Sequence, residues 1–176
     1  MRIDLITKEY PPHIYGGAGV HVAELVKVLR NQIEVKVRCF GEDRNETDTF
    51  AYRHNPEFES VNGALQTMSV DLNMVNDIAG ADLVHSHTWY ANFAGQVAGT
   101  LHGIPHLITA HSLEPLRPWK EQQLGGGYRL SSWVERTAYE GATGIIAVSD
   151  GMRKDILRAY PQLDPNKVSV VHNGID

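Results

Sequence analysis

The sequence predicts an α/β fold, a Rossmann-like doubly wound parallel sheet with helices on both faces. Short β-branched and apolar segments alternate with segments of helical periodicity along all 176 residues. Strands separated by helices pair in parallel, and the helices cover both faces of the sheet. Such sheets bind ligands outside the carboxyl ends of their strands, where the strand order reverses. The residues directly after each predicted strand are therefore the candidates for function.

The N-terminal quarter of the chain predicts two strands and one helix. Residues 3–7 are mostly apolar and predict a strand, which a proline- and glycine-rich loop over residues 10–19 follows. Residues 22–29 repeat valine and leucine at helical spacing. Residues 34–39 alternate valines with charged residues and predict the second strand. Residues 41–62 are polar, so we expect a long surface excursion there.

The central part continues the alternation of strand and helix. We expect a strand near residues 65–68 and a helix near residues 70–78. Residues 82–85 form a short apolar strand, and residues 90–102 have helical periodicity that ends at a glycine. Residues 105–110 predict another strand, with proline at its first position, where no ladder hydrogen bond is lost.

The C-terminal part predicts two more helices and two more strands. The residues Ser132-Trp133-Val134-Glu135 match a capping box that would open a helix. Residues 144–148 predict a strand, after which Ser149 and Asp150 cap a helix that stops at Tyr160. Residues 168–172 predict the last strand, and Asn173-Gly174 is typical of a turn.

Composition excludes several classes of protein. Apolar residues make up 42% of the chain, which favours a packed core over disorder. Acidic residues outnumber basic ones by 21 to 16, and no cluster of lysine and arginine appears, so no nucleic-acid partner is expected. No apolar run is long enough to cross a membrane. Cys39 is the only cysteine and cannot form an internal disulfide, so we expect a cytoplasmic protein.

Three glycines follow the first predicted strand. Gly16, Gly17 and Gly19 open the first helix, where free N–H groups and a partial positive charge suit a phosphate. A tight turn chosen for steric reasons explains them as well. The spacing matches neither the dinucleotide fingerprint nor a Walker loop.

Two histidines lie at and just after the end of the strand predicted at residues 82–85. His85 and His87 form a His-x-His pair, which in some hydrolases binds a metal. Strand alternation places both rings on one side of the sheet. We find no carboxylate at a matching strand end that would complete a metal site, so hydrogen-bonded structure or contact with a polar ligand is preferred.

Further candidates follow the first strand and the strand at residues 105–110. His111 lies where a group facing the ligand is expected, although a capping or core histidine is the alternative. Glu9 precedes the glycine loop and faces the same crevice. Arg117 and Lys120 follow His111 and are either surface charges or a grip for a phosphate. These strand ends together suggest a phosphorylated, hydroxyl-rich ligand.

Together these residues resemble the N-terminal domain of GT-B fold glycosyltransferases, along the whole chain and in the right order. The segment over residues 109–132 looks most like bacterial glycogen synthases of the glycosyltransferase family four type, some of which make maltose 1-phosphate. The motifs that carry the resemblance are Lys8-Glu9-Tyr10-Pro11-Pro12, Gly16-Gly17-Ala18-Gly19-Val20-His21-Val22, Asp82-Leu83-Val84-His85-Ser86-His87-Thr88-Trp89, Thr109-Ala110-His111-Ser112-Leu113, Ala147-Val148-Ser149 and His172-Asn173-Gly174-Ile175-Asp176.

The resemblance implies two Rossmann-like domains with the active site between them. Residues 1–172 would be the acceptor-side domain and residues 173–176 the start of the hinge, with the nucleotide-sugar-binding domain absent from this chain. Glucose would pass from ADP-glucose or UDP-glucose, with retention and without a metal or cofactor, to a glucan or glucose 1-phosphate. This half alone is expected to be inactive.

The resemblance also implies roles for individual residues. His111 matches the histidine beside the donor sugar ring, and Glu9 and His85 match positions on the acceptor side. The loop from Gly16 to Gly19 would approach the donor diphosphate and the acceptor. Thr88 stands where classical glycogen synthases carry aspartate, and Tyr15 stands near their lysine. Both departures leave room for a small phosphorylated acceptor.

Two other functions stay open from the sequence. A metal-dependent hydrolase would use His85 and His87 as ligands, and sensitivity to chelators would reveal it. A non-catalytic sugar- or nucleotide-binding module would need no second domain.

Overall fold

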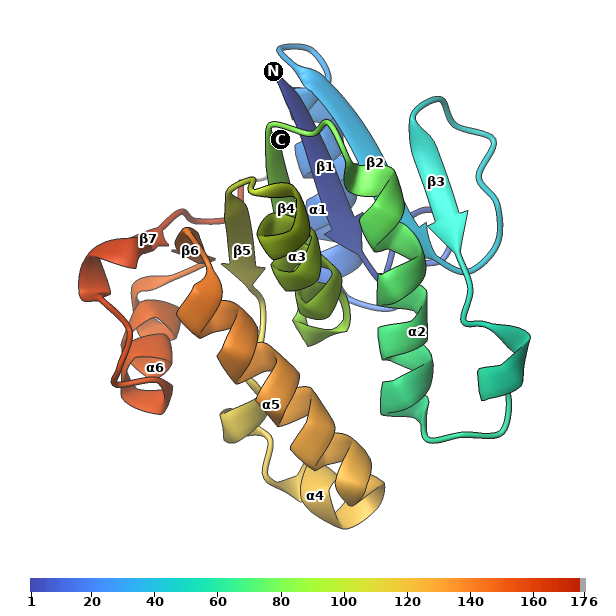
Figure 1. The fold of residues 1–176 in the computed structure, drawn as a ribbon. Coiled ribbons are helices and arrows are strands. Elements are labelled where there is room, and N and C mark those ends of the chain that lie inside the picture. The colour runs from blue at the N-terminus through green and yellow to red at the C-terminus, as the bar shows by residue number, and fades with distance from the viewer. Residues whose placement is uncertain (175–176) are drawn as a thin grey trace.

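The computed structural model describes residues 1–174 as a seven-stranded parallel sheet with helices on both faces (Figure 1). This confirms the predicted fold class. The strands are β1 (Arg2–Thr7), β2 (Glu34–Phe40), β3 (Thr49–Tyr52), β4 (Leu83–His87), β5 (His106–Ala110), β6 (Gly144–Ala147) and β7 (Val168–Val170). The longer helices are α1 (Gly17–Leu29), α2 (Gly63–Val75), α3 (Trp89–His102), α4 (Trp119–Leu124), α5 (Gly126–Gly141) and α6 (Asp150–Ala159), and single 3₁₀ turns span Pro56–Phe58, Asn76–Ile78, Glu114–Leu116 and Pro165–Lys167.

The strand order is β3-β2-β1-β4-β5-β6-β7, so the direction in which successive strands are added to the sheet reverses between β1 and β4. From β1 the chain first builds outward through β2 and β3, and then returns to add β4 on the other side. The loops after β1 and β4 therefore diverge to opposite faces and leave a crevice between them. The glycine loop follows β1 and His87 ends β4, so both lie at this crevice.

Alternation along β1 assigns the two faces of the sheet. Leu5 packs with Val22 and Val26 of α1 on one face. Ile6, the next residue, packs with residues of α2 and α3 on the other face. Figure 1 shows α2 and α3 in front of the sheet and α1 behind it. Both faces of the central strands are thus buried, as their apolar sequences require.

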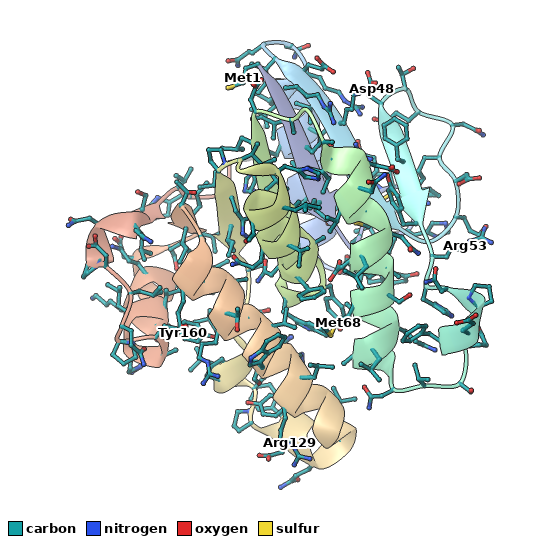
Figure 2. The ribbon with its side chains drawn as sticks, viewed as in Figure 1. Met1, Asp48, Arg53, Met68, Arg129 and Tyr160 are labelled. Carbon is teal, nitrogen blue, oxygen red and sulfur yellow. The ribbon has the colours of Figure 1, made fainter. Side chains whose placement is uncertain are left out.

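Two predictions for the central part were wrong. Residues 65–68 were predicted as a strand but belong to α2, whose buried side chains recur at helical spacing, as Ala64, Thr67, Val70 and Met74 do. Met68 on the same helix packs against the side of α3 and α5 (Figure 2). The predicted surface excursion over residues 41–62 contains β3, which pairs with β2 as the edge strand.

The predicted capping box at Ser132 was also wrong. Helix α5 begins six residues earlier, at Gly126. Glu135 points into the interior, where it accepts hydrogen bonds from the Glu114 backbone and the Tyr160 hydroxyl. By contrast, the predicted cap at Ser149 is confirmed, since its hydroxyl accepts a hydrogen bond from the Met152 backbone N–H.

The end of the chain is described as far as Gly174. The predicted hinge at residues 173–176 includes Ile175 and Asp176, which lie outside the described residues. Within residues 1–174, no helix has the length and apolar character needed to span a bilayer.

Candidate functional site

The glycine loop is held in place by Glu9. Its carboxylate accepts hydrogen bonds of 2.8 Å from the backbone N–H groups of Tyr15 and Gly16. A Cβ at Gly19 would lie 2.8 Å from the Cβ of Glu9, closer than real Cβ atoms come to a neighbour. The contact with Glu9 therefore requires glycine at position 19. The Glu9 carboxylate, which was predicted to bind substrate, instead binds the backbone of the glycine loop.

The other two glycines leave the start of α1 open. Gly16 and Gly17 are exposed, and a Cβ at Gly17 would meet nothing within 4 Å. The first N–H groups of a helix have no partner within it, and the helix dipole places partial positive charge there. This end of α1 can accept an anion from the side of the crevice.

Three histidines from three elements meet beside this loop. His87 at the end of β4 forms a 3.0 Å hydrogen bond between its Nδ1 and the Nε2 of His111, which directly follows β5. His21 on α1 places its ring edge-on to His111, with 5.0 Å between ring centroids. Ring nitrogens of all three lie within 4.8 Å of one another. The crevice is therefore walled by imidazoles.

Burial keeps these imidazoles uncharged. Desolvation, with the nearby His21, lowers the pKa of His111 to about 4. Desolvation and neighbouring histidines lower the pKa of His85 to about 3, and the pKa of His87 falls well below its ordinary value for the same reasons. At neutral pH these rings act as hydrogen-bonding groups and not as cations.

His85 lies deeper than the sequence suggested. Its Nε2 is hydrogen-bonded to the Thr109 hydroxyl at 2.8 Å, and the residue is 5% exposed. Its ring lies 4.4 Å from the His87 ring, so the predicted placement of both rings on one side is correct. His85 supports His87 from beneath. A metal pair of His85 and His87, the alternative that the sequence disfavoured, is not the grouping observed, because the ring nitrogens that lie close together belong to His87, His21 and His111.

Thr88 has a strained backbone. Its φ of 65° and ψ of 164° lie in a region that is nearly restricted to glycine. Its hydroxyl is buried and has no hydrogen-bond partner among residues 1–174. Backbone strain of this kind persists only where the surrounding structure enforces it, and strained residues are common at ligand-binding sites.

A cavity of about 400 Å³ opens at the start of α3, and the cluster histidines His21, His87 and His111 are not among its lining residues in the described chain. Its lining includes Lys8, the residue after β1, and Trp89 and Tyr90 at the start of α3. Asn62, which caps α2, and Gly63, its first residue, close another side. The volume suits a small ligand, and a cation and a helix N-terminus face it.

Lys8 is the cation of this cavity. Its Nζ lies 3.7 Å from the centre of the Tyr90 ring, a cation–π contact. Burial lowers the pKa of Lys8, the charge of Glu9 partly offsets this, and the positive charge of Lys120 lowers it further. The ammonium therefore lacks full solvation and would gain from an anionic ligand.

Lys120 is committed to a buried carboxylate. Its Nζ donates a 2.8 Å hydrogen bond to Glu114, which is fully buried and also accepts from the Ser131 hydroxyl. Arg117 is half-buried, and its guanidinium forms no hydrogen bond or ion pair with residues 1–174. Neither residue lines the cavity as far as the structure describes the chain.

Sequence reasoning missed His21, Lys8 and Tyr90 as parts of the site. His21 and Lys8 stand within the motifs of the glycine loop and the first strand end, so their positions beside predicted ligand groups were a usable signal. Tyr90 lies three residues beyond the end of β4, and ligand-binding residues gather near such strand ends.

The comparisons with known proteins agree with this geometry. The model of glycosyltransferase family 4 matches residues 15–176. The chain belongs to glycosyltransferase family 4. It is 57% identical to the alpha-maltose-1-phosphate synthases of Mycolicibacterium smegmatis and Mycobacterium tuberculosis over 176 residues, which are 100% of this chain and 45% of each relative. The chain thus spans about half the length of the curated relatives it matches.

Solved structures share the fold. Anabaena HepE in complex with UDP-glucose matches with a TM-score of 0.72 and 17% identity, over 100% of this chain and 44% of that one. The catalytic domain of starch synthase IV from Arabidopsis thaliana, bound to ADP and acarbose, matches with a TM-score of 0.69 and 14% identity, over 99% of this chain and 52% of that one. These likenesses support the predicted N-terminal half of a GT-B fold.

Proposed function

We propose that this chain is the acceptor-side half of a retaining α-1,4-glucosyltransferase that joins glucose from ADP-glucose to glucose 1-phosphate, within glycogen synthesis. The observation that carries the proposal is the 57% identity to alpha-maltose-1-phosphate synthases along the entire chain. A cavity with a cation, and a histidine cluster at the ends of β4 and β5, are the features that such a reaction needs.

His111 is the proposed catalytic residue, in contact with the donor sugar. Positive charge develops at the anomeric carbon as the bond to the diphosphate breaks. A protonated imidazole would repel that charge, whereas burial lowers the pKa of His111 to about 4 and keeps it neutral. Its hydrogen bond with His87 holds the ring in one orientation. A neutral, oriented donor or acceptor beside the reacting carbon stabilises the transition state without reorganisation.

The glycine loop is proposed to approach the donor diphosphate. Gly16 and Gly17 expose the N-terminus of α1 to the crevice, while Glu9 and Gly19 hold the loop in shape. The remaining charge on the leaving diphosphate would be met by the part of the protein beyond this chain. The isolated chain is therefore proposed to lack transferase activity.

The cavity beside Lys8 is proposed to hold glucose 1-phosphate. Thr88 and His85, which the sequence assigned to substrate binding, do not line this cavity in the described chain. The Lys8 ammonium and the start of α2 supply positive charge for the phosphate. A neutral glucan end would gain little from either group. Arg117 stays a candidate for a second phosphate contact, because its guanidinium is uncommitted within the described chain, whereas the proposed role of Lys120 passes to Lys8.

The test compares acceptors in the full-length protein that contains this chain. Lys8→Met should raise the KM for glucose 1-phosphate by more than tenfold, since a charge-assisted hydrogen bond contributes about 1.5–3 kcal/mol. Use of a maltooligosaccharide should change little. Arg117→Gln tested beside it reports whether the arginine also touches the phosphate.

Two results would contradict the proposal. If Lys8→Met affects both acceptors equally, the cavity is not the phosphate site. If the unmodified protein forms no maltose 1-phosphate from ADP-glucose and glucose 1-phosphate, the reaction itself is wrong; UDP-glucose run in parallel tests the choice of nucleotide.

A further inference from the structure

We propose that His21, His87 and His111 form a binding site for a transition-metal ion of the zinc type, and that the bound ion blocks the site. The ion is a reversible inhibitor in this proposal and not a cofactor. The binding itself depends only on the three rings, while the blocking rests on the function proposed above.

The geometry suits one ion held by three nitrogens. Each ring offers a nitrogen, and the three lie within 4.8 Å of one another, with His87 and His111 at 3.0 Å. In a tetrahedral zinc site with bonds of about 2.0–2.1 Å, ligand nitrogens lie roughly 3.4 Å apart. Small ring rotations at His21 and His111 reach this spacing and replace the hydrogen bond between His87 and His111 with bonds to the ion.

The three ligands are brought together by the fold. His21 is carried by α1, His87 ends β4, and His111 directly follows the neighbouring strand β5. His87 is fully buried and is backed by the ring of His85, so it cannot swing away from the site. A site preorganised by rigid elements loses little conformational entropy when it binds an ion.

The donor set selects the class of ion. Imidazole suits zinc, nickel and copper, whereas magnesium and calcium require oxygen ligands. The cluster consists of histidines alone. Accessible zinc sites have three protein ligands and a fourth position that is open to water or another ligand. Because His21 and His111 are only partly buried, the fourth position here can be reached from solvent.

An ion bound to the three histidines would make the His111 imidazole unavailable to the donor sugar. A metal-bound imidazole nitrogen has no lone pair left for the sugar, and a divalent charge beside the anomeric carbon opposes the positive charge that develops there. Zinc is therefore expected to inhibit transfer, and a chelator is expected to restore it.

The experiment measures metal binding by calorimetry at pH 7.5 in the full-length protein, first freed of metal with EDTA. Zinc should bind with a component that is weakened at least tenfold by His21→Ala and by His111→Ala. Cobalt in the same site should give the intense visible absorption of tetrahedral coordination. Magnesium should give no heat from this site. His87 is left unchanged because it is fully buried and its replacement endangers folding.

His54→Ala is the matched control. His54 pairs with Glu59 at 2.8 Å outside the histidine cluster, and a His–Glu pair of this kind binds zinc adventitiously. His54 also lines the cavity beside Lys8, so this variant is a control for metal binding and not for transfer. Zinc binding that falls in His54→Ala but not in His21→Ala or His111→Ala would overturn the proposal. The inhibitory role is tested separately, in the unmodified protein. If His21→Ala and His111→Ala abolish zinc binding but zinc does not inhibit transfer by the unmodified protein, the ion binds without blocking the site. Because binding is measured without substrates, its result does not depend on the proposed reaction.

Discussion

Thr88 holds a backbone conformation that threonine rarely adopts. The strain is local, because the residue lies between the end of β4 and the start of α3 and cannot relax without moving either element. Its buried hydroxyl faces no partner in the described chain. Strain of this sort costs about 1–3 kcal/mol and is retained where a ligand contact needs the side chain.

We predict that Thr88→Gly is more stable than Thr88→Ala by about 1 kcal/mol, since both remove the hydroxyl but only glycine accepts a φ of 65° without strain. Urea unfolding of the two variants measures the difference. Both should lose activity relative to Thr88→Ser, which keeps the hydroxyl. Equal stability of the glycine and alanine variants would refute the strain.

His111 is the single residue on which transfer is expected to depend most. We predict that His111→Ala lowers kcat of the full-length protein by roughly two to four orders of magnitude, the range for loss of a transition-state contact. Stability should change little, because the ring is only partly buried at the crevice. Circular dichroism of the variant checks this, and an unfolded variant would instead assign His111 to the core.

Helix α3 approaches the sheet closely at Gly95. A Cβ at Gly95 of α3 would lie 2.2 Å from Nε2 of His106 on β5. The His106 ring is nearly buried and is bonded to the Ser86 hydroxyl at 2.7 Å, so it cannot move aside freely. Glycine at this point sets the distance between helix and strand.

We predict that Gly95→Ala destabilises the protein by about 1–3 kcal/mol through overpacking, despite the higher helix propensity of alanine. Gly63→Ala in the first turn of α2 is the control, because a Cβ there meets nothing within 4 Å. Thermal unfolding compares the two. A Gly95→Ala variant as stable as the control would show that α3 can shift outward.

The segment between β5 and α5 is anchored by a buried ion pair. Glu114 lies in the first 3₁₀ turn of this segment and Lys120 in α4, and Ser131 of α5 completes the contacts of the carboxylate. The pair ties α4 to the body of the protein, beside the strand that delivers His111.

We predict that Lys120→Met destabilises the protein by about 3 kcal/mol, because it leaves the buried Glu114 carboxylate without its cation. Lys27→Met removes an exposed pair with Glu24 and should cost less than about 1 kcal/mol. Urea unfolding of both variants measures the contrast. Equal, small losses would show that Lys120 is a solvated surface charge.

At the scale of the whole molecule, buried titratable groups make stability depend on pH. Five imidazoles have lowered pKa values because burial disfavours their charged form, namely His21, His85, His87, His106 and His111. Each binds a proton in the unfolded chain below about pH 6.5 but not in the folded protein. Their contribution is present above that pH and is lost as the pH falls toward the folded pKa.

Asp71 and Glu135 act in the opposite sense. Burial raises the pKa of both, that of Glu135 to about 7, so the folded protein binds protons that the unfolded chain lacks. The five imidazoles outnumber the two carboxyl groups. Each imidazole that no carboxyl group offsets changes the free energy of unfolding by about 1.4 kcal/mol per pH unit.

We therefore predict that the free energy of unfolding falls between pH 6.5 and pH 5, as urea unfolding at several pH values would show. Asp71→Asn removes one opposing group and should steepen the fall. A stability that stays level or rises on acidification would contradict the burial of the imidazoles.

Much of the architecture could be predicted because it depends on local patterns. Six of the seven predicted strands are observed, since alternation and β-branched runs are readable within a few residues. The strand β3 was missed because it is an edge strand of only four residues within a long polar stretch. Residues 65–68 of α2 were predicted as a strand because a segment of only four residues fits both the alternation of a strand and the spacing of a helix.

The sequence by itself determined the fold class, the family and the edge of the sheet where the site lies, because strand alternation and residue order along the chain are local properties. Only the tertiary structure decided which side chains meet there. In the structure, Glu9 accepts hydrogen bonds from the loop backbone and Lys120 donates one to Glu114. His21 joins His87 and His111 in the histidine cluster. Each of these contacts joins separate elements, and its partners are set by strand register and helix packing, which no single segment encodes.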